Sequence, residues 1–237
     1  MAKDSPSIRK NLVMKVKAGA QANQSIIDGI AVLQALAVSE EPVGNRELAR
    51  RLDMEPTRVN RLLKTLASIG MTQQTDNRKY APGPGMHVLA TQSLYASGLL
   101  RHAIAPLEKL AYFGHTVALG VLWHDSVSFL YHARPGMPSS EAIGRIGLRP
   151  ASTSGIGMAL LAASPEESVI HTYENKEIPG FPKGLESILD TLHTIRDQGY
   201  SRVLVQSDNP EARGKPTHTI AVPVGSPVNS AIAISGW

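Results

Sequence analysis

The segment EPTRVNRLLKTL, Glu55 to Leu66, carries the pattern that best indicates the fold of this chain. Its apolar residues recur at three- and four-residue steps, and Pro56 suits the first turn of a helix, where a missing N–H costs no hydrogen bond. The segment therefore predicts an amphipathic helix. Its apolar face contains Val59, Leu62, Leu63 and Leu66, and its polar face contains Thr57, Arg58, Asn60, Arg61 and Lys64.

Two helices are expected before this one. Apolar residues recur at helical spacing from Ser25 onward, which places Ile26 and Ile30 on the inward face of a first helix. A short second helix, NRELARRL, begins at Asn45, which would cap it, and presents Arg46 outward.

A hairpin is expected after the quoted helix. Gly70 provides a C-terminal cap, and MTQQTDNRKYAP reads as two short strands about a turn, with Arg78 and Lys79 in the hairpin. The order helix, short helix, turn, helix, hairpin predicts a winged helix-turn-helix domain over residues 25–83.

The polar face of the quoted helix suits contact with DNA. In a winged helix-turn-helix, the last helix enters the major groove with its N-terminal half towards the base edges, while flanking elements contact phosphates. Arginine pairs bidentately with guanine and asparagine with adenine, each good pair contributing about 1 to 3 kcal/mol of discrimination. The alternative is a small helical domain with a solvated basic face. We expect DNA contacts from Arg46, Thr57, Arg58, Asn60, Arg61, Lys64, Arg78 and Lys79.

The positive charge is concentrated at the front of the chain. The net charge is +4, and residues 1–85 contain thirteen Lys and Arg against eight Asp and Glu, whereas the remainder contains eleven against twelve. Such asymmetry favours an anionic partner, most commonly nucleic acid. Much of the excess lies in residues 1–24, a polar, irregular segment expected to be a flexible basic arm.

The composition excludes several classes of protein. No apolar run approaches the roughly 18 to 20 residues of a membrane span, and the charged N-terminus lacks the apolar core of a signal peptide, so a cytoplasmic protein without a membrane partner is expected. The absence of cysteine excludes disulfides, thiolate metal sites and a cysteine nucleophile. The eight histidines show no HExxH pattern and no close pairing, so no metal is expected.

The second part of the chain has a different pattern. Residues 84–98 are expected to form a connecting helix, whose apolar stripe packs on its own chain or across a dimer axis. Residues 99–237 alternate strands and helices, which predicts an α+β architecture with an antiparallel sheet flanked by helices. Strands are expected at 116–123, 127–133, 201–205, 219–224 and 229–235, and helices at 103–113, 157–163 and 185–197, with another opened by a capping box at Ser164.

A Ser/Thr/Gly-rich segment from Ser152 to Gly157 precedes one of these helices. Its backbone amides and hydroxyls are suited to a carboxylate or another anion, although ordinary helix capping uses the same residue types. The segment is not a nucleophile elbow, because Ser152 rather than glycine stands two residues before Ser154, and the Walker pattern is absent.

In its motifs the chain resembles the isocitrate lyase regulator (IclR) type of bacterial transcription factor, over about Ser25 to Gly236. The resemblance rests on SIIDGIAVLQAL, ELARRLDMEPTRVNRLLKTLASIGMTQQ and RKYAPGPGMHVLA, and then on LRPASTSGIGMALLA, IRDQGYS, IAVPV and AIAISG. It implies a homodimer or dimer of dimers, a winged helix on operator DNA, and a C-terminal GAF-like domain that binds a small effector without any cofactor. The family usually continues through another helix beyond Trp237, so one sheet face would depend on a neighbouring subunit.

The resemblance also implies roles for particular residues. Arg61 stands at the family's usual arginine, and the effector loop corresponds to Ser154, Gly155 and Ile156, with Ser152 beside it. Thr219 and Ser235 fall where family members place pocket side chains. Thr219 and Ala233 replace a cysteine and a serine of small-acid sensors, which favours a larger or aromatic effector, and the family's pocket aspartate would align with Asp208.

These observations support a ligand-responsive DNA-binding regulator rather than an enzyme. An alternative is an enzyme or ligand-binding domain fused to a helical adaptor, without sequence-specific DNA binding; it would need a catalytic base near Ser152 or Ser154. A third hypothesis, binding through the basic arm alone, predicts equal affinity for any duplex.

Overall fold

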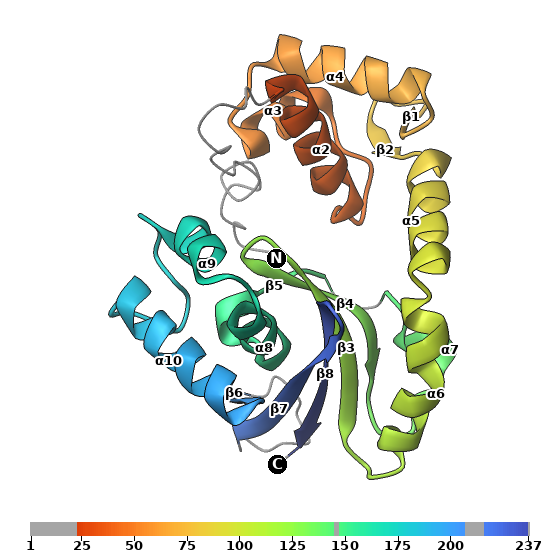
Figure 1. Cartoon of the computed structure of the whole chain (residues 1–237). Helices are drawn as coiled ribbons and strands as arrows, with labels where there is room; N and C mark the ends of the chain where they lie inside the picture. Colours follow the sequence, from red (N-terminus) through yellow and green to blue (C-terminus); the bar gives the residue numbers. More distant parts are fainter. Residues whose placement is uncertain (1–22, 145–146, 207–215, 237) are drawn as a thin grey trace. The chain divides into compact units, whose positions relative to one another are not determined.

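The structure is a computed structural model of the chain, and it describes residues 23–144, 147–206 and 216–236 (Figure 1). It divides into two compact units, with the boundary between Ser97 and Gly98. The first unit is helical with a small hairpin, and the second contains a six-stranded antiparallel sheet with helices, so the predicted α+β class is confirmed. Apart from its last two residues, the expected flexible arm lies outside the described residues.

The first unit has the element order predicted for a winged helix-turn-helix. Val59 and Leu63 of the quoted helix are completely buried, and Leu62 and Leu66 pack against the same core, which confirms the predicted apolar stripe. Gly70 follows this helix with a φ of +74°, a left-handed conformation typical of a C-terminal cap. The elements are α2 (Gln24–Ala37), α3 (Asn45–Leu52), α4 (Pro56–Ser68), β1 (Thr72–Gln74), β2 (Tyr80–Pro82) and α5 (Pro84–Ser97).

Two details of the first unit differ from the sequence prediction. The inward face of α2 does not contain Ile26 and Ile30, which are 63% and 41% exposed; it contains Asp28, Ala31 and Val32. Helical periodicity alone is compatible with either face of α2 being buried, and the face that is buried includes the carboxylate of Asp28. Asn45 does not cap α3, because Gly44 is the N-cap residue and Asn45 is the first residue of the helix.

The second unit is built on a sheet with the strand order β5-β4-β3-β8-β7-β6, all neighbours antiparallel. Helices α8, α9 and α10 lie on one side of the sheet, and α6 and α7 lie on the other (Figure 1). The strands are β3 (Thr116–Trp123), β4 (Ser126–Ala133), β5 (Arg149–Pro150), β6 (Ser201–Gln206), β7 (Pro216–Gly225) and β8 (Val228–Gly236). The helices are α6 (Leu99–Ala111), α7 (Ser139–Ala142), the 3-10 turn η1 (Ala151–Thr153), α8 (Gly155–Ala163), α9 (Glu166–Tyr173) and α10 (Leu185–Gln198).

Small residues let α8 lie close to the sheet. Ala221, Ala231 and Ala233 are buried beneath this helix, in a core that also contains Ile156. A Cβ atom on Gly157 would come within 2.2 Å of the Ala151 carbonyl oxygen, so glycine is required where η1 meets α8. The position of α8 therefore depends on small residues at two places, the alanines of the sheet and Gly157 next to η1.

Three boundaries in the second unit correct the sequence prediction. Helix α6 begins at Leu99 rather than Ala103, with Pro106 in its interior, and α8 begins at Gly155 rather than Gly157. The predicted capping box at Ser164 does not form, because Pro165 is the N-cap residue of α9. The Ser164 hydroxyl instead donates to the Leu160 carbonyl of the preceding helix at 2.8 Å.

Candidate DNA-binding surface and effector site

A tight turn between α3 and α4 sets the direction of the candidate recognition helix. Asp53 adopts a left-handed conformation with a φ of +52°, and Glu55 is the N-cap residue of α4. The side-chain amide of Asn45 donates to the Pro56 carbonyl at 3.1 Å, which ties the start of α3 to the start of α4. The sequence prediction missed this role of Asn45.

The outward face of α4 brings together most of the predicted DNA-contacting residues. Thr57, Arg61 and Lys64 are exposed, and Asn60 is partly exposed beside them. Arg46 is exposed on α3. Two arginines and one lysine thus lie on exposed faces of the helix-turn-helix, as electrostatic attraction to a phosphate backbone requires.

Arg58 is placed differently from its neighbours. The sequence predicts it on the DNA-reading face, but its Nη2 lies 2.5 Å from Oδ2 of Asp28, a fully buried residue of α2. The helical wheel cannot show this contact, because the carboxylate is 30 positions earlier in the chain. In the structure, Arg58 joins α4 to α2.

The hairpin places two further basic residues at its tip. Arg78 and Lys79 are both exposed in the loop between β1 and β2, and the Lys79 carbonyl accepts a hydrogen bond from the Thr75 amide at 2.8 Å. Arg78 has a φ of +58°, a left-handed conformation that is uncommon for a residue other than glycine or asparagine.

The N-terminus of α8 has free backbone donors. Ser154 is the N-cap residue, and its Oγ accepts a hydrogen bond from the Gly157 amide at 3.4 Å. Among the described residues, the amides of Gly155 and Ile156 have no acceptor, as is usual at the start of a helix. Such donors, together with the helix dipole, favour a bound anion.

Thr219 and Ser235, which the family resemblance assigns to an effector pocket, lie beside this helix end. Their hydroxyl oxygens are 2.8 Å apart on adjacent strands β7 and β8. A Cβ on Gly155 would come within 2.7 Å of the Thr219 Cγ2, so the threonine side chain faces the start of α8. The structure therefore brings Ser154, Gly155, Thr219 and Ser235 into one region.

Two other effector candidates have structural roles. The Ser152 hydroxyl donates to the Pro179 carbonyl at 2.7 Å, and the Ile156 side chain is buried in the core. Their contribution to a site would come from the backbone. Asp208 lies outside the described residues.

Two titratable groups have perturbed pKa values, His124 in the β3–β4 turn and Tyr173 at the end of α9. Burial lowers the pKa of His124 below its ordinary value; the negative charge of Asp125 opposes this shift, and the Lys176 cation adds to it. Burial also raises the pKa of Tyr173 above its ordinary value, with the negative charge of Asp125 adding to the effect. The Lys176 ammonium lies 3.6 Å from the Asp125 carboxylate. Both shifts favour the neutral forms of His124 and Tyr173, which is the state expected for partly desolvated side chains.

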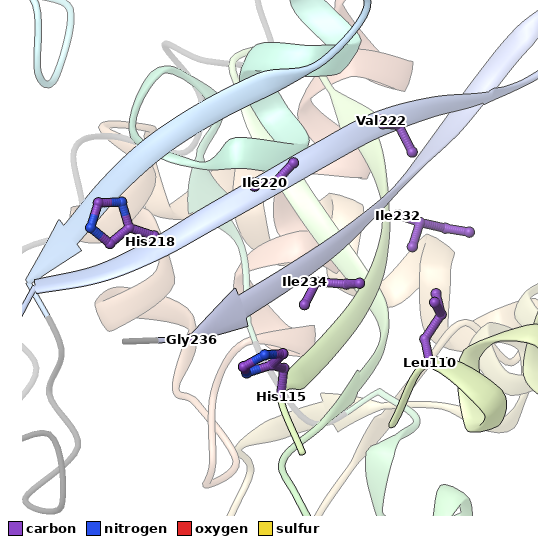
Figure 2. Close-up of a pocket in the computed structure, with 8 residues that line it drawn as sticks. All are labelled: Leu110, His115, His218, Ile220, Val222, Ile232, Ile234 and Gly236. Carbon is purple, nitrogen blue, oxygen red and sulfur yellow. The ribbon is translucent and has the colours of Figure 1, made fainter. Parts of the chain in front are cut away.

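A shallow groove of about 580 Å³ lies on the opposite face of β7 and β8 (Figure 2). Figure 2 shows two imidazoles, those of His115 and His218, near the end of β8 at Gly236. Because arginine can only donate, the 3.3 Å contact from Arg202 Nη2 assigns His218 Nδ1 as an acceptor. The remaining lining residues are aliphatic: Leu110, Ile220, Val222, Ile232 and Ile234.

Metal sites and membrane spans are absent from the part of the chain that the structure describes. No three His, Asp or Glu side chains there are grouped so that they could hold a metal ion. None of the helices described is both long and apolar enough to cross a bilayer.

The two units define a class of protein, in which a helix-turn-helix domain is joined to a domain built on an antiparallel sheet. Residues 26–76 match the IclR helix-turn-helix domain, and residues 91–236 match the bacterial transcriptional regulator IclR C-terminal domain. The chain therefore belongs to the IclR family of transcriptional regulators.

Individual relatives agree with this assignment. The chain is similar to the HTH-type transcriptional regulator BhcR of Paracoccus denitrificans, with 36% identity over 140 residues, which are 58% of this chain and 47% of that protein. The chain thus spans about half the length of this curated relative. An IclR family regulator from Brucella abortus has the same fold, with a TM-score of 0.71 at 22% identity over 98% of this chain and 89% of that one. An IclR homolog from Microbacterium hydrocarbonoxydans, solved in complex with 4-hydroxybenzoate, gives a TM-score of 0.61 at 19% identity over 89% and 88% of the two chains.

Proposed function

We propose that this protein binds operator DNA through its first unit, and that a small organic acid bound in its second unit changes this affinity. The observation that carries the proposal is the outward face of α4, where Asn60, Arg61 and Lys64 stand on a helix that begins at a tight turn. In this role the protein is a cytoplasmic regulator and not an enzyme.

Base reading is assigned to the first turns of α4. Asn60 and Arg61 have the side chains that pair bidentately with adenine and guanine. Lys64, Arg46 and the hairpin residues Arg78 and Lys79 are assigned to the phosphate backbone or the minor groove. Thr57, at the start of the helix, is suited to a phosphate or a base edge.

The effector is proposed to be a carboxylate with an aromatic body. The free amides of Gly155 and Ile156 would hold the carboxylate, and the hydroxyls of Thr219 and Ser235 would orient it. The buried Ala233 leaves fewer polar groups in this region, which suits an apolar body. The 4-hydroxybenzoate complex of the Microbacterium homolog supports this class of ligand.

A homo-oligomer is proposed because α5 has no buried residue in the structure. Leu89, which belongs to the apolar stripe expected from the sequence, is 57% exposed, and its neighbour Val88 is 51% exposed. A dimer would bury this stripe and present two copies of α4 to two half-sites of an operator. Size-exclusion chromatography with light scattering tests the oligomeric state.

The DNA experiment compares the segment upstream of the protein's own gene with a scrambled duplex, across a salt series. Phosphate-driven binding depends steeply on salt whatever the sequence, so only the affinity ratio between the two duplexes reports base reading. We expect a large ratio for the wild type, and Arg61→Ala should reduce it by about 5- to 150-fold, the equivalent of about 1 to 3 kcal/mol. Equal binding of every duplex, including duplexes selected from a random library, would disprove the proposal.

The effector experiment measures thermal shifts with 4-hydroxybenzoate and other aromatic acids, against glyoxylate and pyruvate. Thr219→Val is the matched variant, because it keeps the side-chain shape and removes the hydroxyl that contacts Ser235. We expect stabilisation by aromatic acids in the wild type and a smaller shift in the variant. Stabilisation by the small acids alone would contradict the aromatic class, and a bound acid that leaves DNA affinity unchanged would contradict the coupling.

A further inference from the structure

Asp28 is a buried carboxylate in the interior of the first unit. Asp28 is 0% exposed, and Ala31 and Val32 on the same face of α2 are equally buried. Its Oδ1 accepts a hydrogen bond from the Gln24 side-chain amide at 2.9 Å, and its Oδ2 lies 2.5 Å from Arg58 Nη2. A buried carboxylate is strongly unfavourable unless it is paired, so the Arg58 cation is one of the groups that stabilise the charge of Asp28.

The position of Arg58 gives the pair its significance. Arg58 lies in the first turn of α4, between Thr57 and the two proposed base-reading residues, Asn60 and Arg61. The side chain of Arg58 is 36% exposed, so the guanidinium is partly withdrawn from the surface towards α2. The ion pair therefore joins the start of the candidate recognition helix to the buried face of another helix.

We propose that Arg58 is a positioning residue, and that its ion pair with Asp28 fixes the rotation of the first turns of α4 so that Asn60 and Arg61 meet base edges. This inference rests on the proposed DNA-binding function. A recognition helix that rotates about its axis moves its side chains away from the bases they read, and phosphate contacts, which carry no sequence information, do not restore that reading. The pair therefore governs sequence discrimination more than total affinity.

The pair also removes one cation from the DNA-facing surface. A free guanidinium at position 58 would contact phosphate on any duplex, which raises non-specific affinity without reading sequence. Asp28 prevents this by engaging Arg58. Loss of the carboxylate is then expected to have two effects in opposite directions, weaker discrimination and stronger non-specific binding.

A direct role for Arg58 on DNA makes different predictions, and salt dependence separates the two. Each phosphate contact contributes about 0.9 to the slope of log affinity against log salt concentration. If Arg58 contacts phosphate, Arg58→Met lowers this slope by about that amount. If Arg58 only positions α4, Arg58→Met leaves the slope unchanged, and Asp28→Asn raises it.

The experiment uses the full chain, with the operator duplex and a scrambled duplex, for Asp28→Asn, Arg58→Met and the double variant. We expect each single variant to lower the operator-to-scrambled affinity ratio roughly tenfold, and the double variant to lower it no further than either single one. Arg58→Lys should restore part of the ratio, because it keeps the charge and loses the planar fork. Circular dichroism in the same buffer confirms that each variant compared is folded, and Arg58→Lys alone serves the comparison if Arg58→Met unfolds.

The outcomes distinguish the inference from the function on which it rests. A wild-type chain with no operator preference refutes the proposed function. If the wild type discriminates, two results refute the positioning role and make Arg58 a DNA contact. One is additive losses in the double variant, and the other is a reduced salt slope in Arg58→Met. The positioning role is also refuted if Asp28→Asn discriminates between the two duplexes as well as the wild type does.

Discussion

Replacing Gly157 with alanine should destabilise the second unit, although alanine is the better helix former. A Cβ at this position would lie 2.2 Å from the Ala151 carbonyl oxygen and 2.4 Å from the Ala151 Cα, both of which are backbone atoms. Ordinary contact needs a displacement of η1 or α8 by about 1 Å or more, and overpacking of this kind costs about 1 to 3 kcal/mol. The helix-propensity gain of about 1 kcal/mol offsets part of this cost. We expect a net loss of up to about 2 kcal/mol.

The matched control is Gly29→Ala in α2. Among the residues that the structure describes, no atom lies within 4 Å of a Cβ built on Gly29, so the same substitution in another helix should stabilise its unit by about 0.4 to 1 kcal/mol. Urea denaturation separates the two effects, because both tryptophans, Trp123 and Trp237, belong to the second part of the sequence. Tryptophan fluorescence therefore follows that unit, and circular dichroism follows both.

The reasoning fails if Gly157→Ala unfolds at the same or a higher urea concentration than the wild type. The result would mean that η1 can move away from α8 at little energetic cost, and that the close approach of Ala151 to Gly157 does not require glycine. The constraint also has a functional consequence, because Gly157 is in the first turn of α8, where the effector is proposed to bind. Gly157→Ala should therefore reduce the thermal shift caused by aromatic acids as well.

Two further predictions concern strained or titrating positions. Arg78→Gly should stabilise the first unit by up to about 1 kcal/mol, because glycine adopts the φ of +58° freely. The same change should weaken DNA binding, because it removes a cation. Denaturation and duplex titration measure the two effects, and a loss of stability in the variant would contradict the argument. For His124, the folded pKa is below the unfolded value of about 6.5, so the unfolded chain binds the proton first and stability is lost as the pH falls below that value. His124→Asn keeps a residue that tolerates the φ of +56° and should lose less stability between pH 7 and pH 5, whereas identical wild-type and variant pH profiles would exclude the effect.

Local patterns account for much of the fold that the sequence predicted. The stripe through Val59 and Leu63 needs only helical periodicity, and the hairpin after Gly70 needs only a turn signal between short polar strands. In the second unit the strand Thr116–Trp123 was predicted at its observed bounds for the same reason. Each of these features is decided by residues within about ten positions of one another.

Features set by distant partners were not predicted. Asp28 shares a helical face with Val32 and Ala35, and this was the available sign that α2 buries a charge, but its partner Arg58 lies 30 positions away. The contact between Thr219 and Ser235 depends on the register of β7 and β8, which residue patterns do not specify. These two positions entered through the family resemblance instead.

Strand alternation places two surfaces on the hairpin formed by β7 and β8. Thr219 and Ser235 face α8, while His218, Ile220 and Ile234 face the open groove. Because side chains alternate with a period of two, inserting or deleting one residue within either strand would exchange the two sets, burying histidine against α8 and exposing the hydroxyls. If the effector binds here as proposed, substitutions in this hairpin change the ligand-facing side chains and leave the groove as it is, whereas a change of strand length alters both surfaces together.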